Sequence, residues 1–475
     1  MLKNHVKNSI REVLGFEPTE SQEEMIDKLS GYITAPHGDM VFLLKGYAGT
    51  GKTSVVSALV KVLGGMRIKT VLLAPTGRAA KVLSHYAGTS ALTIHKKIYR
   101  QQSTADGTGR FTLDRNLHKD TVFIVDEASM ISNLSQESSI FGSGHLLDDL
   151  VEYVYTGTNC RLILVGDVAQ LPPVGLDMSP ALYPQELEYY NLEVLMSELT
   201  DVVRQEADSG ILHNATQIRS ILEHEEEDGY GFWPIETQGF TDIIRLGGEE
   251  LIEEISSCYS QYGMEETMIV TRSNKRANKF NEGIRRTVLY REEEISIGDL
   301  LMVVKNNYYW AKGIEELDFI ANGDIAEIIR IRKYEELFGF RFASVTLRFV
   351  DYKDVEIDCK IFLDTLMHDG ASFTSAENKR LFEAVAEDYV DIRNKRQRWE
   401  KIRENEYFNA LQVKFAYAVT CHKAQGGQWK AVFVDHGYLT EEMIDREYLR
   451  WMYTAFTRPT ERLYLVNFKK EFFGE

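Results

Sequence analysis

The sequence predicts an α/β protein with two parallel sheets, one in each of two larger units. Within the first 200 residues, short apolar runs alternate with segments of helical spacing. The apolar runs are residues 41–46, 70–75, 121–130 and 161–167. Buried runs of this length, each followed by a helix, are typical of parallel strands covered by helices on both faces.

A second set of apolar runs lies at residues 267–274, 414–421, 430–437 and 462–468. These runs predict a second α/β unit. Its sequence is interrupted, because a long segment separates the first run from the other three.

The interrupting segment has two parts. Residues 299–363 contain stretches that alternate apolar and polar residues, with a turn signal at ANGD, and predict a small antiparallel β unit. Residues 377–408 show helical spacing with charges of both signs, which is typical of a solvated helix. A shorter insertion at about 100–120, containing ADGTG, predicts a hairpin.

These patterns divide the chain into three predicted domains. The first spans residues 1–200 and includes the hairpin. The second combines residues 201–299 with 411–475, and residues 300–410 form an inserted accessory domain consisting of the β unit and the charged helices.

The composition is that of a soluble globular protein. Among 475 residues, 44% are hydrophobic and 27% are charged, which excludes disorder as the main state. Four scattered cysteines without metal-ligand spacing predict reduced thiols rather than a disulfide framework. Since the sequence also lacks a signal-peptide pattern and an apolar run near the roughly 20 residues that span a bilayer, we expect a cytoplasmic protein without a membrane partner.

The charge is acidic overall but unevenly distributed. The 54 Lys and Arg residues against 72 Asp and Glu residues give a net charge of −18, which argues against coating nucleic acid by net charge alone. Residues 41–100, however, contain no Asp or Glu, and residues 271–291 carry seven basic residues against Glu282. We therefore expect a local basic channel on a protein with an acidic exterior.

The segment GYAGTGKT at residues 46–53 is the strongest motif. It fits the pattern G-x-x-x-x-G-K-[ST], follows a predicted strand and opens a predicted helix. Glycines allow backbone N–H groups to approach phosphate oxygens, the lysine reaches the β- and γ-phosphates, and the threonine hydroxyl ligates Mg²⁺. The predicted nucleotide-binding residues are Gly46, Ala48, Gly49, Thr50, Gly51, Lys52, Thr53 and Ser54.

An acidic pair completes the predicted ATP site. Asp126 and Glu127 end the apolar run VFIVDEAS, where both carboxylates can face the γ-phosphate. We expect Asp126 to hold Mg²⁺ through water, together with Thr53, and Glu127 to accept the proton of the attacking water.

Further motifs make the chain resemble the superfamily 1 DNA helicases, in the branch of RecD-like and phage Dda-like enzymes. In chain order, they are PTESQEEMI, the phosphate loop, APTGRAAKVL, TIHKKIY, VDEASM, LVGDVAQLPPVG, LTDVVRQ, TCHKAQGGQ and YTAFTRPTERLYLV. The resemblance covers nearly the whole chain. It implies two RecA-like P-loop domains, ATP and Mg²⁺ in the cleft between them, and a small β-barrel-like accessory domain that closes over the strand.

The resemblance also assigns residues. It implies that Gln22 reads adenine, that Gln170 senses the γ-phosphate, that Arg204 contacts phosphate and that Arg458 is the arginine finger. The implied contacts to single-stranded DNA are Pro75, Thr76, Arg78, Thr93, His95, Thr420, His422 and Lys423. Phe111 in the predicted hairpin is a candidate wedge for duplex junctions.

Two positions depart from the family pattern. Pro459 follows the finger arginine, where many relatives carry a small or basic residue, and a proline biases the preceding residue away from the helical region. Gly77 stands where some relatives have a larger side chain, so a DNA contact there is either missing or made by the backbone.

The resemblance implies ATP-dependent translocation on single-stranded DNA with duplex unwinding, and implies the 5′ to 3′ direction because this branch moves that way. We expect a monomer that acts in DNA repair, recombination or replication. One alternative is a DNA-stimulated ATPase or nucleotide switch that does not unwind. Another is a RecD-like motor subunit of a helicase–nuclease complex, and a third is RNA as the track. Strong stimulation of ATP hydrolysis by single-stranded DNA would separate a motor from a switch.

Overall fold

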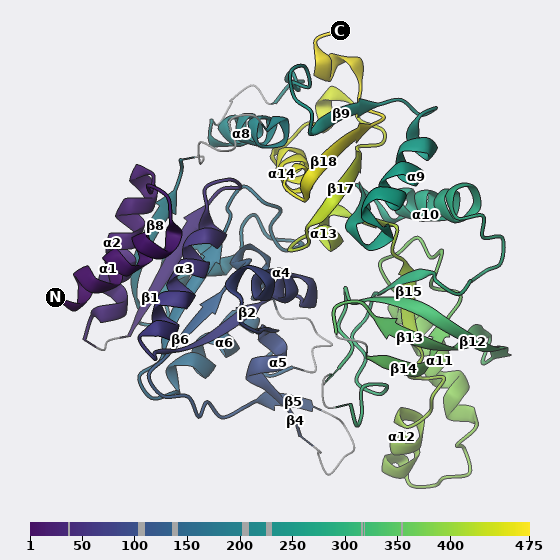
Figure 1. Cartoon of the computed structure of the whole chain (residues 1–475). Coiled ribbons are helices and arrows are strands. Elements are labelled where there is room, and N and C mark those ends of the chain that lie inside the picture. Colours follow the sequence, from purple (N-terminus) through teal and green to yellow (C-terminus); the bar gives the residue numbers. More distant parts are fainter. Residues whose placement is uncertain are drawn as a thin grey trace.

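The computed structural model describes residues 1–36, 39–102, 110–134, 141–201, 209–224, 230–314, 317, 319–352 and 355–475. They form two α/β units and a closed β-barrel with two attached helices (Figure 1). The architecture confirms the predicted fold class, including the barrel-like accessory domain.

The first unit is built on a six-stranded parallel sheet in the order β3-β2-β6-β7-β1-β8. Alternate strand residues face opposite sides. Phe42 and Leu44 therefore join one apolar core and Val41 and Leu43 the other. The strands are β1 (Met40–Gly46), β2 (Lys69–Ala74), β3 (Ala91–Thr93), β6 (Thr121–Val125), β7 (Arg161–Gly166) and β8 (Glu193–Leu199).

Helices cover both faces of this sheet (Figure 1). Residues of the first three helices and of β1 share one core, and residues of α5 and α6 share the other. The helices are α1 (Leu2–Leu14), α2 (Glu20–Thr34), α3 (Lys52–Gly65), α4 (Gly77–Ala87), α5 (Ile94–Ile98), α6 (Leu146–Tyr155) and α7 (Pro184–Glu188). The predicted hairpin appears as the antiparallel pair β4 (Tyr99–Gln102) and β5 (Arg110–Leu113).

The second unit has a five-stranded parallel sheet in the order β16-β10-β17-β18-β9. Its strands are β9 (Ile243–Leu246), β10 (Thr267–Thr271), β16 (Ala418–Thr420), β17 (Trp429–Asp435) and β18 (Pro459–Val466). Its helices are α8 (Gly210–Glu223), α9 (Leu251–Tyr262), α10 (Asn274–Gly283), α13 (Cys421–Ala424) and α14 (Arg446–Phe456).

The barrel is closed by β15, which the sequence pattern assigned to the second α/β unit. The predicted strand at residues 414–421 is divided: β15 pairs with β11 and β14, whereas β16 pairs with β10. A buried apolar run is compatible with either sheet, so the pattern alone did not separate them. The barrel strands are β11 (Leu300–Val303), β12 (Ile325–Leu337), β13 (Phe340–Phe349), β14 (Glu356–Phe362) and β15 (Leu411–Phe415).

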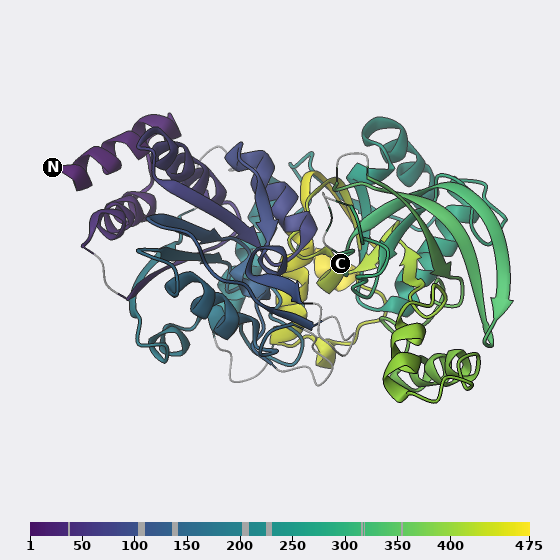
Figure 2. The same cartoon turned by 90° about the horizontal axis from the view of Figure 1, so that it is seen from below.

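Two charged helices, α11 (Ser375–Glu387) and α12 (Lys395–Arg403), project beside the barrel (Figure 2). They are more than a solvated face, because Leu381, Val385 and Ile402 pack in a small core with three barrel phenylalanines. All four cysteines are buried and free. Among the described residues, we find no helix with the length and apolarity needed to cross a bilayer.

Candidate nucleotide site and nucleic-acid surface

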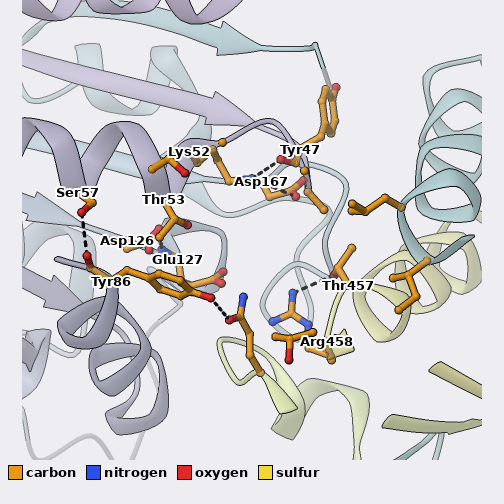
Figure 3. A pocket seen from close by; sticks show the side chains of 18 of the residues that line it. Tyr47, Lys52, Thr53, Ser57, Tyr86, Asp126, Glu127, Asp167, Thr457 and Arg458 are labelled. Carbon is orange, nitrogen blue, oxygen red and sulfur yellow. Dashed lines mark hydrogen bonds and ion pairs between the residues drawn. The ribbon is translucent and has the colours of Figure 1, made fainter. Parts of the chain in front are cut away.

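A cavity of about 620 Å³ lies between the two α/β units (Figure 3). The first unit lines it with the phosphate loop, Asp126, Glu127, Asp167 and Gln170. The second unit contributes residues 457–460, which include Arg458. The polar groups of this lining follow the ends of several strands, which is the usual position of a ligand site in α/β folds.

The phosphate loop joins β1 to α3. Gly51 is the N-cap of α3 and has a left-handed backbone with a φ of 79°. The Lys52 ammonium donates to the carbonyl oxygens of Gly46 (2.7 Å) and Tyr47 (2.6 Å), and lies 3.6 Å from Asp167 Oδ2. The loop thus presents a lysine and a helix N-terminus to the cavity, an arrangement suited to bind a phosphate chain.

The acidic pair follows β6. Glu127 has a φ of 54°, and its N–H donates to Asp126 Oδ1 at 2.8 Å. Burial raises the pKa of both carboxyls, that of Glu127 to about 7 even though Arg458 opposes the shift. The Asp126 carboxylate and the Thr53 hydroxyl both line the cavity, and this all-oxygen donor set fits Mg²⁺.

Asp167 and Tyr453 connect the two units at the phosphate loop. The Tyr453 hydroxyl, on α14, donates to Asp167 Oδ2 (2.8 Å) and accepts from the Ala48 N–H (2.7 Å). Both side chains are almost fully buried. Sequence reasoning assigned neither residue a role; the acidic end of the 161–167 run was the available signal for Asp167, and no local signal marked Tyr453.

Gln170 and Arg458 lie in the cleft as predicted from the motifs. Gln170 is buried, and its Oε1 has no hydrogen-bond partner in the part of the chain that the structure describes. Arg458 is 3% exposed and donates to the carbonyl oxygens of Thr454 (2.9 Å) and Gly427 (3.2 Å). Arg204 lies outside the described residues.

Gln22 has a different environment from the one expected of an adenine reader. Its Nε2 donates to the Thr50 carbonyl at 2.9 Å, and its Oε1 accepts from the Thr19 N–H at 3.1 Å. The side chain is fully buried and does not line the cavity, so in this structure it braces the phosphate loop. Apolar residues that sequence reasoning missed, Val13 and Phe16, line the cavity instead.

The motif segments proposed to contact DNA meet across the two units. Arg78, in the first turn of α4, donates to the Gln428 carbonyl at 2.9 Å and lies over the Trp429 ring. Gly426 has a φ of +70°, and a Cβ there would lie 2.8 Å from Ala79 Cβ. The APTGRAAK and TCHKAQGGQ segments therefore form one surface, with Pro75 just before Thr76, the N-cap of α4.

Two threonines of this set already have structural roles. Thr76 caps α4 by accepting from the Ala79 N–H, and Thr93 caps α5 by accepting from the Lys96 N–H. Thr420 makes no such capping hydrogen bond. Of the three candidate threonines, Thr420 is thus the one whose hydroxyl does not cap the helix that follows it.

The hairpin end of this surface differs from expectation. Phe111, the candidate wedge, is 5% exposed and packs against Phe141, Tyr308 and Phe319, so in this structure its ring is not available to a duplex junction. His95 packs on the same cluster, and burial lowers its pKa to about 4. Its imidazole is therefore neutral at pH 7.

The second-unit candidates are close to the barrel. Burial and the neighbouring Lys414 lower the pKa of Lys423 to about 8, and its ammonium donates to Asn322 Oδ1 of the barrel. Burial also lowers the pKa of His422. A DNA phosphate would raise the pKa of Lys423 again by supplying a counterion.

The expected basic channel is only partly present. In the 271–291 run, Arg276 pairs with Asp435, and both Arg285 and Arg291 pair with Asp299. Arg286 pairs with Glu282, leaving much of this run neutralised. Carboxylates outside this run, Asp299 shortly after it and Asp435 far along the chain, cancel charges that looked unbalanced within it.

Two family models match the chain. Residues 19–225 match an AAA domain, and residues 415–466 match the UvrD-like helicase C-terminal domain. These two regions contain the phosphate loop and Arg458, respectively.

Curated relatives cover most of the chain. The ATP-dependent RecD2 DNA helicase of Deinococcus radiodurans is 24% identical over 94% of this chain and 48% of its own length. The ATP-dependent DNA helicase dda of Enterobacteria phage T4 is 27% identical over 60% of this chain and 62% of its own length. Among solved structures, Pif1 helicase from Bacteroides in complex with ADP-AlF3 and ssDNA is 14% identical, covers 96% of this chain and 94% of its own, and has a TM-score of 0.47.

Proposed function

The chain belongs to the superfamily 1 ATP-dependent DNA helicases of the RecD-like and Dda-like branch, and on this premise we propose that it is a 5′ to 3′ motor on single-stranded DNA. The cavity is the observation that carries the proposal. One side holds a phosphate loop and an acidic pair, and the other holds a buried arginine. A site divided in this way links nucleotide chemistry to movement of one unit against the other.

Each residue then has a part in the reaction. Lys52 and the loop amides bind the phosphates, Thr53 and Asp126 would hold Mg²⁺, and Glu127 takes the proton from water. Bound Mg²⁺ would neutralise charge on the phosphate oxygens.

Two residues in the cleft, Gln170 and Arg458, are proposed to act on the γ-phosphate when the two α/β units close around the nucleotide. Gln170 is proposed to sense the γ-phosphate by donating from its amide nitrogen. Its amide oxygen, which has no hydrogen-bond partner among the described residues, remains free to accept from water. Arg458 stabilises the charge that develops on the transferred group, and Arg204 is proposed to assist it.

Single-stranded DNA is proposed to run over the surface formed by α4 and the 420–428 loop. Thr420, His422 and Lys423 contact it from the second unit, and Arg78 from the first. Contacts of this kind hold phosphate and sugar without reading the sequence. The enzyme is proposed to act as a cytoplasmic monomer at duplex junctions, in repair, recombination or replication.

Direction is tested with duplexes that carry a single-stranded tail at one end only. We expect ATP-dependent unwinding of the duplex with a 5′ tail and little unwinding with a 3′ tail. A strand-displacement assay with equal tail lengths measures both. Preference for the 3′ tail would reject the proposed direction, and DNA-stimulated ATP hydrolysis without displacement of either duplex would favour the switch alternative.

Tyr453 provides a test of how the two units are joined. Tyr453→Phe removes the hydroxyl that serves both Asp167 and the Ala48 N–H. Leaving two buried polar groups without this partner is expected to lower the free energy of unfolding by about 1–3 kcal/mol. Denaturant unfolding of the full chain measures the change.

Tyr448→Phe is the matched control, because Tyr448 lies on the same helix, is equally buried and has a hydroxyl without a hydrogen-bond partner among the described residues. Loss of the Tyr448 hydroxyl is expected to change the free energy of unfolding little. Equal effects of the two substitutions would show that the hydrogen bonds of Tyr453 contribute nothing specific.

A further inference from the structure

The barrel contacts both α/β units at residues proposed to hold DNA. The contact is made by Asn322, Asp324, Asp351 and Tyr352, which we call the acidic barrel patch. Figure 1 shows the barrel beside both units, so one small surface can reach across the cleft.

Asp351 faces two cations of the first unit. Its Oδ1 lies 3.0 Å from Lys81 Nζ and 3.7 Å from Arg78 Nη1. The Lys81 ammonium also donates to the Val350 carbonyl at 3.3 Å. The Asp351 side chain is 3% exposed, so it is enclosed by the contact. A carboxylate thus occupies the position on α4 where a DNA phosphate would be expected.

Asp324 approaches the first turn of the same helix. A Cβ added at Gly77 would lie 3.0 Å from Asp324 Oδ1 and 3.4 Å from the Tyr352 hydroxyl. A larger side chain at residue 77 would therefore push the patch away. The positive end of α4 also favours a negative group here. The departure at Gly77 is thus explained by the close approach of the barrel.

Asn322 extends the patch to the second unit, where its Oδ1 accepts from the Lys423 ammonium. Lys423 is one of the proposed DNA contacts. The patch therefore places oxygen atoms on basic groups of both α/β units. The phosphate oxygens of a single DNA strand would contact the same groups.

The contact is electrostatically costly, which makes it displaceable. Neither carboxylate oxygen of Asp351 has a hydrogen-bond partner in the described part of the chain. Burial, with the nearby charge of Asp351, raises the pKa of Asp324 to about 7. Asp324 accepts hydrogen bonds from the Ala321 N–H and the Tyr352 hydroxyl, whereas Asp351 is held by its ion pairs with Lys81 and Arg78. The desolvation cost of burying an ion pair offsets much of its attraction.

We propose that the acidic barrel patch is an intramolecular competitor of single-stranded DNA, which must displace it from α4 and Lys423 in order to bind. This inference rests on the proposed DNA path. It makes strand entry depend on release of the barrel from the first unit. Only the form of the protein in which the barrel has moved away from α4 and Lys423 would then bind DNA.

The test measures binding of a fluorescent oligothymidylate to the full chain at fixed salt. Asp351→Asn removes the charge while conserving shape, and a double variant adds Asp324→Asn. We expect the Kd to fall roughly threefold to tenfold, and the DNA concentration for half-maximal ATP hydrolysis to fall in parallel. Asp358→Asn is the control, because it removes the same charge from the barrel at a residue that pairs with Arg332.

The outcomes separate the inference from the proposed function. Unchanged or weaker binding by both patch variants, relative to Asp358→Asn, would overturn the competitor. Arg78→Ala and Lys423→Ala test the track itself and are expected to weaken binding. If these two bind as tightly as the wild type, the proposed DNA path is wrong; if they weaken binding while the patch variants do not tighten it, only the competitor is wrong.

Discussion

Lys52→Ala is expected to abolish ATP turnover while the fold stays intact. The ammonium is the one cationic side chain of the phosphate loop, and it lies on the loop carbonyls at the entrance to the cavity. Without this ammonium, the negative charge that develops on the phosphates is no longer stabilised by a lysine of the loop. Loss of one such group costs on the order of 10²–10³-fold in turnover.

The measurement is steady-state ATP hydrolysis with saturating single-stranded DNA, beside thermal unfolding of the same preparation. Lys69→Ala is the control, since Lys69 is an exposed lysine at the start of β2 and does not line the cavity. Hydrolysis at the wild-type rate by the Lys52 variant would mean that the phosphate loop is not the catalytic site.

Arg458→Ala is expected to have the second large effect. An arginine finger that engages the transferred phosphoryl group is worth roughly 10³-fold or more in kcat. Arg458 is well placed to act from the second unit, because its guanidinium lies in the cavity and its charge opposes the raised pKa of Glu127. We expect kcat to fall far more than the affinity for ATP.

The guanidinium also donates to the Gly427 and Thr454 carbonyls, so its removal can destabilise the fold. The free energy of unfolding of the variant is therefore measured beside kcat. Arg458→Lys keeps the charge but loses the planar fork, and it is expected to remain strongly impaired. Arg462→Ala is the matched control, because Arg462 follows closely in the chain and donates to the Thr241 carbonyl. A folded Arg458→Ala protein with wild-type kcat would remove this residue from the mechanism.

The ATP site was predictable largely because its parts are contiguous. Phosphate loops combine glycines, a lysine and a threonine within eight residues, and VFIVDEAS combines a strand with its terminal acids. Local backbone geometry then follows from residue type, as the left-handed Gly51 illustrates. Arg458 was found through the order of motifs rather than from any local chemistry.

Contacts between distant segments were not predictable. Tyr453 reaches the phosphate loop from 405 positions along the chain, and nothing beside it in the sequence marks that role. Phe111, the candidate wedge, is buried because Tyr308 and Phe319, which lie between β11 and β12 of the accessory domain, pack against it. Charge along the chain was equally misleading for residues 271–291, where Asp299 and Asp435 neutralise the arginines.

The sequence by itself determined the α/β class, the phosphate loop and the order of the motifs, since these depend on local periodicity and on residue types a few positions apart. Only the tertiary structure decided that β15 belongs to the barrel, that the barrel approaches Gly77 closely, and which basic residues form ion pairs. Those outcomes depend on packing between segments far apart in the chain. Burial then decides whether a carboxylate such as Asp351 faces water, a lysine or, as we propose, the place of a DNA phosphate.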